Sequence, residues 1–230
     1  MQPYTRKETV NLSGCGIREI DFDCILGIKS SNIINKTELL KLPTCKKISV
    51  KFNKITVLKN IPEKIEALDC SVNKLQQLET LPNSLKFLNC VGNEIVSLNN
   101  LPSNLTHLEC SINKLSSLEN LPLKLKFLNC SSNQIENLDF LPGGLEYLIC
   151  ASNKITRLDD LPFTIVHLDC DNNKIISLNN LPTALNELSL INTCTNFNNF
   201  KNIKKIHADS ITKINSSEKS DDNSIKIIIK

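Results

Sequence analysis

Apolar residues recur along most of this chain with a period of twenty, and the recurrence is most regular from Ile61 to Asn180. The unit from Leu81 to Asn100 reads LPNSLKFLNCVGNEIVSLNN, and its first, fifth, eighth, fifteenth and eighteenth places are Leu or Ile in all six units. The tenth place is always Cys and the thirteenth is always Asn. Because each short unit can bury its apolar side only against its neighbours, the pattern predicts one elongated solenoid.

The residues around the eighth place predict one short strand per unit. Successive side chains on a strand face opposite ways, so Leu88 points into the core while Phe87 and Asn89 point outward. The strands are expected to stack in parallel, about 4.8 Å apart, with the outward residues on a concave surface. The proline at the second place disfavours a helix interior. We therefore predict an extended, polyproline-like convex side with little helix.

An asparagine stands at the thirteenth place, where the chain turns inward after its strand. A buried amide has both a donor and an acceptor, so it can bond neighbouring turns together. We predict a structural asparagine ladder formed by Asn53, Asn73, Asn93, Asn113, Asn133, Asn153 and Asn173.

Six of the ten cysteines stand at the tenth place, which is expected to face inward. Zinc sites use close pairs such as C-x-x-C, and the sequence contains no such pair. Parallel neighbouring side chains seldom give the torsion near 90° that a disulfide needs. We predict reduced thiols that pack as small hydrophobes, with disulfides and a metal site as the alternatives.

The two ends of the chain depart from the period. Residues 1–40 keep its rhythm only near Val10, Leu12 and Ile17, and are predicted to form an N-terminal cap with degenerate repeats and a short helix near residues 36–40. Residues 41–200 form the predicted array. Residues 201–230 are predicted to form a C-terminal cap, with a strand within 203–211 and an isoleucine-rich terminal strand that covers the open edge of the stack.

The local form of the repeat, LPxxLxxLxCSxNKLxxLxN, resembles the Leu-Pro class of leucine-rich repeat proteins over residues 42–200. YopM-like bacterial effectors and the recognition domains of the invasion-plasmid-antigen ubiquitin ligases belong to this class, and similar repeats occur in giant viruses. The resemblance implies a right-handed parallel-β solenoid, here of about eight regular 20-residue repeats, that binds other proteins. It implies no catalytic residue, because the ligases' separate catalytic domain has no counterpart in this sequence.

The outward residue before the buried eighth-place leucine is a ring side chain in five successive units, and the outward residue after it is mostly an acid or an amide. Aromatic side chains favour the buried centre of protein interfaces. We therefore predict a partner-binding surface made of Phe87, Asn89, His107, Glu109, Phe127, Asn129, Tyr147, Ile149, His167 and Asp169. Alternatively, stacked rings only stabilise neighbouring strands, and both interpretations can hold together. The pairs His107–Glu109 and His167–Asp169 offer two ligands each, too few for a closed metal site, so we expect no metal, no cofactor and no catalytic residue.

Charge and hydropathy narrow the choice of partner. A net charge of +3 is too small to imply a polyanion, and acids interrupt the basic residues along the middle of the chain, so we expect no nucleic-acid partner. The sequence has neither an apolar run of the roughly 18 residues that span a membrane nor a visible export signal. We expect no membrane partner and a cytoplasmic monomer, in the host cytoplasm if the protein is viral or a translocated effector.

These features favour a non-enzymatic scaffold that binds a protein partner on its concave face, a host protein if the source is viral or bacterial. One alternative is an adaptor or recognition module of a ubiquitin-ligase-like or effector system. A second alternative is a glycan-binding solenoid, because rings beside acids and amides also suit sugars.

Overall fold

The computed structural model describes residues 9–21, 45–176, 178, 180–193, 196–197, 203–208, 213–214 and 226–229. All of its regular elements are short strands, and the part of the chain that it describes contains no helix. In particular, these residues form no apolar helix of membrane-spanning length. The predicted short helix near residues 36–40 lies outside the described residues.

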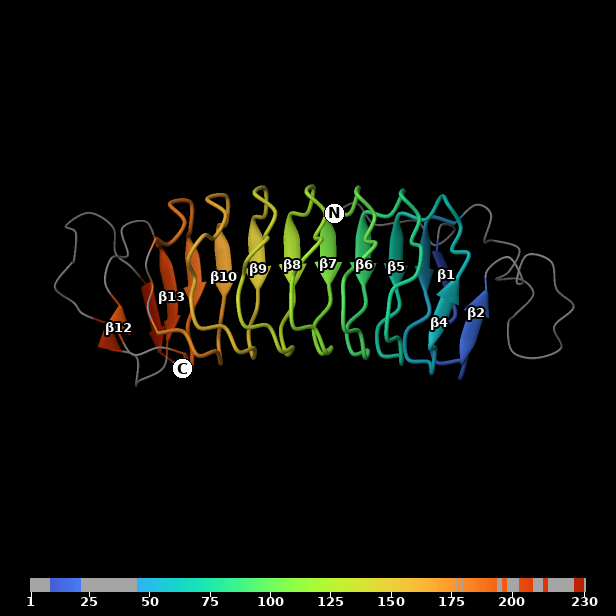
Figure 1. Cartoon of the computed structure of the whole chain (residues 1–230), viewed down its shortest axis with the longest axis horizontal. Helices are drawn as coiled ribbons and strands as arrows, with labels where there is room; N and C mark the ends of the chain where they lie inside the picture. The colour runs from blue at the N-terminus through green and yellow to red at the C-terminus, as the bar shows by residue number, and fades with distance from the viewer. Residues whose placement is uncertain are drawn as a thin grey trace, which may run out of the picture.

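The predicted parallel-β solenoid is confirmed (Figure 1). Neighbouring strands of the array pair in parallel with a step of twenty residues, so that Leu88 lies beside Leu68 and Leu108. One step of the sequence period is therefore one step along the sheet. The strands of the array are β3 (Lys47–Ser49), β5 (Ala67–Asp69), β6 (Phe87–Asn89), β7 (His107–Glu109), β8 (Phe127–Asn129), β9 (Tyr147–Ile149), β10 (His167–Asp169) and β11 (Glu187–Ser189).

The sheet continues past both ends of the array and reaches eleven strands. At the N-terminal end β1 (Thr9–Asn11) pairs with β3, and a separate pair joins β2 (Glu19–Asp21) to β4 (Val57–Lys59). At the other end β13 (Lys205–Ala208) pairs with β11, and β15 (Lys226–Ile229) pairs with β13. A further pair joins β12 (Asn196–Phe197) to β14 (Lys213–Ile214). The predicted strand within 203–211 and the predicted terminal strand beside it are thus confirmed, whereas the limits 1–40, 41–200 and 201–230 stay predictions.

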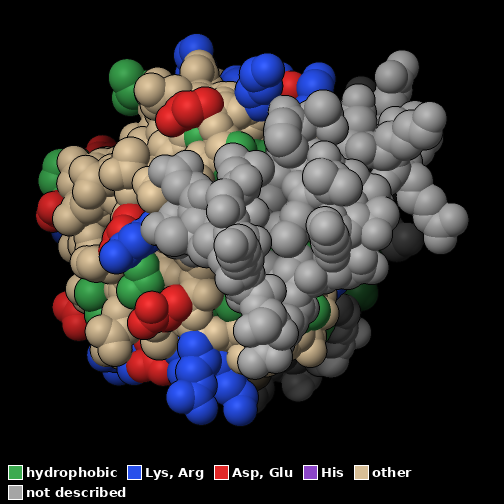
Figure 2. Space-filling view, turned by 90° about the vertical axis from the view of Figure 1, so that its right-hand side faces the viewer, with side chains coloured by type: hydrophobic (Ala, Val, Ile, Leu, Met, Phe, Trp, Pro, Cys, Tyr) green, Lys and Arg blue, Asp and Glu red, His purple; other side chains and the backbone are tan. Residues whose placement is uncertain are grey.

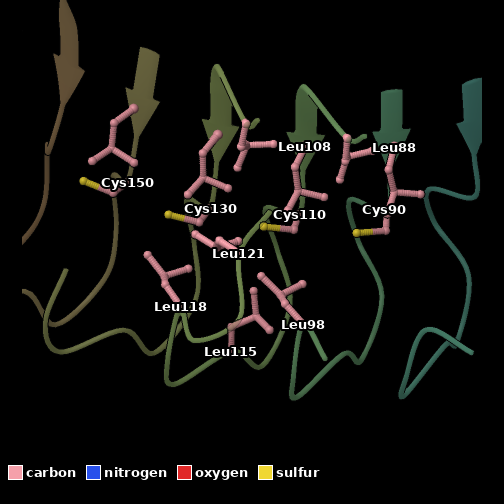
Figure 3. Close-up of a cluster of buried hydrophobic side chains, with 14 of the residues drawn as sticks. Leu88, Cys90, Leu98, Leu108, Cys110, Leu115, Leu118, Leu121, Cys130 and Cys150 are labelled. Atoms are coloured by element: carbon pink, nitrogen blue, oxygen red, sulfur yellow. The ribbon is translucent and has the colours of Figure 1, made fainter. Parts of the chain in front are cut away.

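The core follows the apolar places of the repeat. Leu or Ile at the fifth, eighth and fifteenth places of the array is at most 2% exposed. The cysteines lie in one line just past the C-terminal ends of the strands, opposite leucines of the returning segments (Figure 3). Cys70, Cys90, Cys110, Cys130 and Cys150 are fully buried thiols, and burial raises the pKa of the Cys90 thiol and of the Cys130 thiol to about 12 each. They fill the inward place as small hydrophobic groups, as predicted.

The asparagine ladder is also confirmed, and its bonds run between turns as well as within them. Asn93 Nδ2 donates to the carbonyl oxygens of Cys70 at 3.1 Å and of Cys90 at 3.0 Å, and it lies 3.4 Å from that of Val91. Its Oδ1 accepts the backbone N–H of Leu75 on the preceding turn at 3.0 Å. The same set of bonds recurs at each asparagine from Asn53 to Asn173. At the next turn Thr193 takes the place and keeps one bond, from its hydroxyl to the Leu190 carbonyl.

Two kinds of turn recur in the segments that join successive strands. The proline carbonyl at the second place accepts the backbone N–H of the fifth place, as Pro82 does from Leu85 at 3.0 Å. Backbone with positive φ recurs at the twelfth and twentieth places. The twentieth place is mostly Asn or Asp, the residues that best tolerate this region after glycine. The twelfth place also holds Val72 and Ile112, with φ of 53° and 54°, and branching at Cβ makes those two positions strained.

Candidate functional site

The candidate site lies on the outward side of the parallel sheet, here called the strand face. Each strand from β6 to β10 buries its central leucine and turns its first and third residues outward. Because the strands pair in exact steps of twenty, the first residues of β6 to β10 fall in one line. We call this line of five side chains the ring column: Phe87, His107, Phe127, Tyr147 and His167.

The ring column is a continuous stack, and its two halves differ. Phe87, His107 and Phe127 stack tightly, with ring centroids 4.5 Å and 4.0 Å apart and planes within 19° and 4° of parallel. Tyr147 is more loosely packed, with its ring centroid 6.3 Å from that of Phe127 and 6.1 Å from that of His167. It is also 44% exposed, whereas the other four rings are half-buried. The predicted stacking of rings is therefore present, and Tyr147 is the ring most open to a partner.

The third residues of the strands form the second predicted column, and they also have a structural role. The side-chain oxygens of Asn89, Asn129 and Asp169 each accept the backbone N–H two residues on, at 3.1–3.2 Å. Glu109 instead contacts the neighbouring ring column, with its Oε1 3.3 Å from His107 Nε2. Ile149 is the apolar member of the column and is partly exposed. The structure thus brings all ten predicted residues onto one face, where several of them also hold the local backbone.

The structure also shows a charged cluster beyond His167 that the sequence did not predict. Glu187, the next residue along the column, accepts hydrogen bonds from Lys205, from His207 Nε2 at 3.1 Å and from His167 Nδ1 at 3.2 Å. The bond from Lys205 is the main cause that lowers the pKa of the Glu187 carboxyl to about 2. Lys205 and His207 come from β13, which follows β11 after eighteen residues, not twenty. A strict count of the repeat therefore does not find them, although the segment KIHA has the strand pattern.

Ion pairs across neighbouring turns flank the ring column on its other side. Glu66 contacts Lys46 at 3.1 Å and Lys86 at 2.9 Å, and Lys126 contacts Glu146 at 2.8 Å. At the end that carries β1 and β2, Lys and Arg side chains are interspersed with Asp and Glu around the rim (Figure 2). The charged groups seen there are mixed in sign.

Asp169 and Asp171 differ from the other acids of the strand face. Asp171 Oδ1 accepts the Ile191 backbone N–H at 2.7 Å, and Asp169 Oδ1 accepts that of Asp171. Burial and, secondarily, the charge of Asp171 raise the pKa of the Asp169 carboxyl. No Lys or Arg side chain of the described segments pairs with either carboxylate. Within those same segments, no group of three or more His, Cys, Asp or Glu side chains is placed to hold a metal ion.

Comparison with solved structures identifies the architecture. The chain matches YopM from Yersinia enterocolitica WA-314 with a TM-score of 0.66 and 29% identity, over 82% of this chain and 42% of that one. It matches YopM from Yersinia pestis, described as a leucine-rich effector protein, with a TM-score of 0.63 and 33% identity, over 66% of this chain and 44% of that one. The chain is a leucine-rich repeat protein similar to YopM. No protein-family model and no curated protein matches the sequence.

A third solved leucine-rich repeat structure bears on the cysteines. The functional domain of InlJ from Listeria monocytogenes matches with a TM-score of 0.57 and 26% identity, over 78% of this chain and 47% of that one. That domain is described as including a cysteine ladder, which is the arrangement that the tenth places form here. In all three comparisons this leucine-rich repeat chain spans less than half of the matched chain.

Proposed function

We propose that this leucine-rich repeat protein is a non-enzymatic scaffold that binds a protein partner on the strand face. The observation that carries the proposal is the ring column, because five ring side chains stand in one outward line and Tyr147 is 44% exposed within it. Large rigid rings with few rotatable bonds supply contact area at a low entropic cost and dominate many protein interfaces. The frame of asparagine and cysteine ladders holds these rings in place before any partner arrives.

The geometry favours a protein over a glycan as the partner. In the tight half of the column His107 is covered on both faces, by Phe87 and Phe127, with centroids 4.5 Å and 4.0 Å apart. A sugar packs flat on an exposed ring face, and here it would meet ring edges instead. Ring edges carry a partial positive charge and suit carbonyl oxygens and apolar side chains, which a protein surface supplies.

An effector-like role is supported by the similarity to YopM from Yersinia pestis, which is described as an effector protein. We propose that in such a role the strand face would recognise a host protein in the host cytoplasm. The chain would then act as the recognition module, and its partner would determine the outcome of binding.

The test is affinity capture with paired variants. Phe127→Ala with Tyr147→Ala removes two rings from the ring column, and Phe140→Ala with Phe163→Ala removes two rings that are 69% and 77% exposed elsewhere. We expect one or more proteins, identified by mass spectrometry, to be captured by the wild type and the second variant and lost from the first. Circular dichroism should be unchanged in both variants. Equal capture by all three would refute the proposal.

A further inference from the structure

The outward residues of one turn are all apolar. Across the strand face, each turn presents its seventh, ninth and eleventh places, and between β3 and β11 these three are apolar together only at Tyr147, Ile149 and Ala151. The rings on both sides of Tyr147 are more than 6 Å away, against 4.0–4.5 Å in the tight half of the column. This turn therefore offers apolar area that the neighbouring rings do not cover.

The next turn presents two carboxylates, Asp169 and Asp171, one strand spacing of about 4.8 Å further along the face. Their backbone hydrogen bonds use Oδ1 in each case. The other acids at these places each contact a basic side chain: Asp69 contacts Lys51, Glu109 contacts His107 and Glu187 contacts Lys205. Among the described ion pairs none includes Asp169 or Asp171, although the imidazoles of His167 and His207 act on Asp169 through space.

A carboxylate that is partly removed from water and has no Lys or Arg partner is unfavourable, and two such groups on one face repel each other. A cation brought by a ligand would relieve both effects. Interfaces commonly combine an apolar centre with charged groups at its edge, and the charged groups set specificity and the rate of association. The two adjacent turns have this composition, apolar at one and anionic at the next.

We propose that the partner of the strand face docks through a protein segment that places an apolar side chain against Tyr147 and Ile149 and a Lys or Arg side chain against Asp169 and Asp171. This inference rests on the proposed function and adds the chemistry of the partner. It also assigns the centre of binding to the loose half of the ring column, so that the tight half serves mainly to stiffen the face.

The experiment selects ligands from random peptides, so the natural partner need not be identified first. A phage-displayed library of random twelve-residue peptides is panned on the immobilised full chain, and selected peptides are synthesised and measured by biolayer interferometry. We expect them to combine a large apolar residue with a Lys or Arg within a few positions. Their affinity should fall by about tenfold or more for Tyr147→Ala with Ile149→Ala, and by about tenfold or more for Asp169→Asn with Asp171→Asn, as is common when one partner of a desolvated pair is removed.

The amide variant isolates charge, because an asparagine Oδ1 can still accept the two backbone N–H bonds. Its matched control is Asp159→Asn with Asp160→Asn, which removes the same charge at places nineteen and twenty of the repeat and should leave affinity unchanged. Peptides that lack basic residues, or that keep their affinity for Asp169→Asn with Asp171→Asn, would overturn the cation assignment and leave the proposed function standing.

Two other outcomes overturn the whole inference. One is that panning yields no peptide, or only peptides indifferent to both strand-face variants. The other is a glycan array on which the wild type, but not the Tyr147→Ala with Ile149→Ala variant, binds a sugar. If panning fails, the capture experiment with Phe127→Ala and Tyr147→Ala still tests the proposed function separately. If the glycan array gives that result, the partner is a glycan and both proposals are wrong.

Discussion

Replacing Asn93 by leucine tests the frame on which the strand face depends. Leucine has a similar volume but no polar atom, so the substitution removes the whole set of amide bonds. The Leu75 N–H loses its acceptor and is left buried, which costs about 1–3 kcal/mol. The carbonyls of Cys70 and Cys90 each lose one bond and keep another, from Asn73 and Asn113 respectively.

Each of these two lost carbonyl bonds costs about 0.5–1.5 kcal/mol. Burial of the leucine side chain offsets part of the loss, at about 25 cal/mol per Å² of apolar surface. We therefore expect Asn93→Leu to lower the free energy of unfolding by a net amount of about 2–3 kcal/mol. Some of the lost hydrogen bonds join neighbouring turns, so the substitution also weakens the coupling between repeats on which the stability of a solenoid depends.

The assay is urea unfolding followed by far-ultraviolet circular dichroism, since the chain contains no tryptophan to serve as a fluorescence probe. The matched control is Asn83→Leu, the same substitution at an exposed place, which we expect to stay within about 0.5 kcal/mol of the wild type. If Asn93→Leu unfolds at the same urea concentration as Asn83→Leu, the asparagine ladder does not stabilise the solenoid and the reasoning is wrong.

Three further predictions concern strain, pH and thiol chemistry. Ile112→Asn should raise the free energy of unfolding in urea by about 1 kcal/mol, because Ile112 is exposed with φ 54° and asparagine tolerates that region. The control is Ile176→Asn, which should give no gain, because Ile176 is exposed but is not among the residues with positive φ. The ionised Glu187 carboxyl, whose pKa is lowered to about 2, stabilises the fold above pH 4.5 by about 1–2 kcal/mol after solvent screening. This contribution should be lost as the pH falls toward 2. An acid titration of stability in which Glu187→Gln loses as much as the wild type would contradict it. Cys90 and Cys130, with pKa values raised to about 12, should resist iodoacetamide at pH 8 until urea unfolds the chain, as peptide mass spectrometry can show.

The sequence predicted the frame because every inward place must match the turn before and after it. A period of twenty fixes the register, and the register fixes which side chains share a column, so the order of the rings from Phe87 to His167 followed from counting. The spacing of the rings did not follow, because it depends on side-chain packing: the step from His107 to Phe127 is 4.0 Å and the step from Phe127 to Tyr147 is 6.3 Å.

Other features could not be found by counting. Val72 and Ile112 adopt positive φ without the glycine or asparagine that usually signals it. The strand β1 pairs with β3 although 38 residues separate Thr9 from Lys47. The contacts of Lys205 and His207 with Glu187 likewise depend on a step of eighteen residues at the end of the array. In the last two cases tertiary packing decides the local structure, and a single sequence shows only a broken repeat.

The turn at Tyr147 also departs from the pattern in a way that stability does not explain. In four other turns an Asp or Asn at the ninth place accepts the backbone N–H two residues on, as Asn129 does for Ser131. Ile149 has no acceptor, so this turn forgoes a bond of about 0.5–1.5 kcal/mol and exposes apolar surface instead. A residue that weakens the frame and adds an outward apolar group is expected at a binding surface. In the turn beside it, neither Asp169 nor Asp171 pairs with a Lys or Arg side chain of the described residues. The same stretch of the strand face is therefore where we expect a ligand to contribute most.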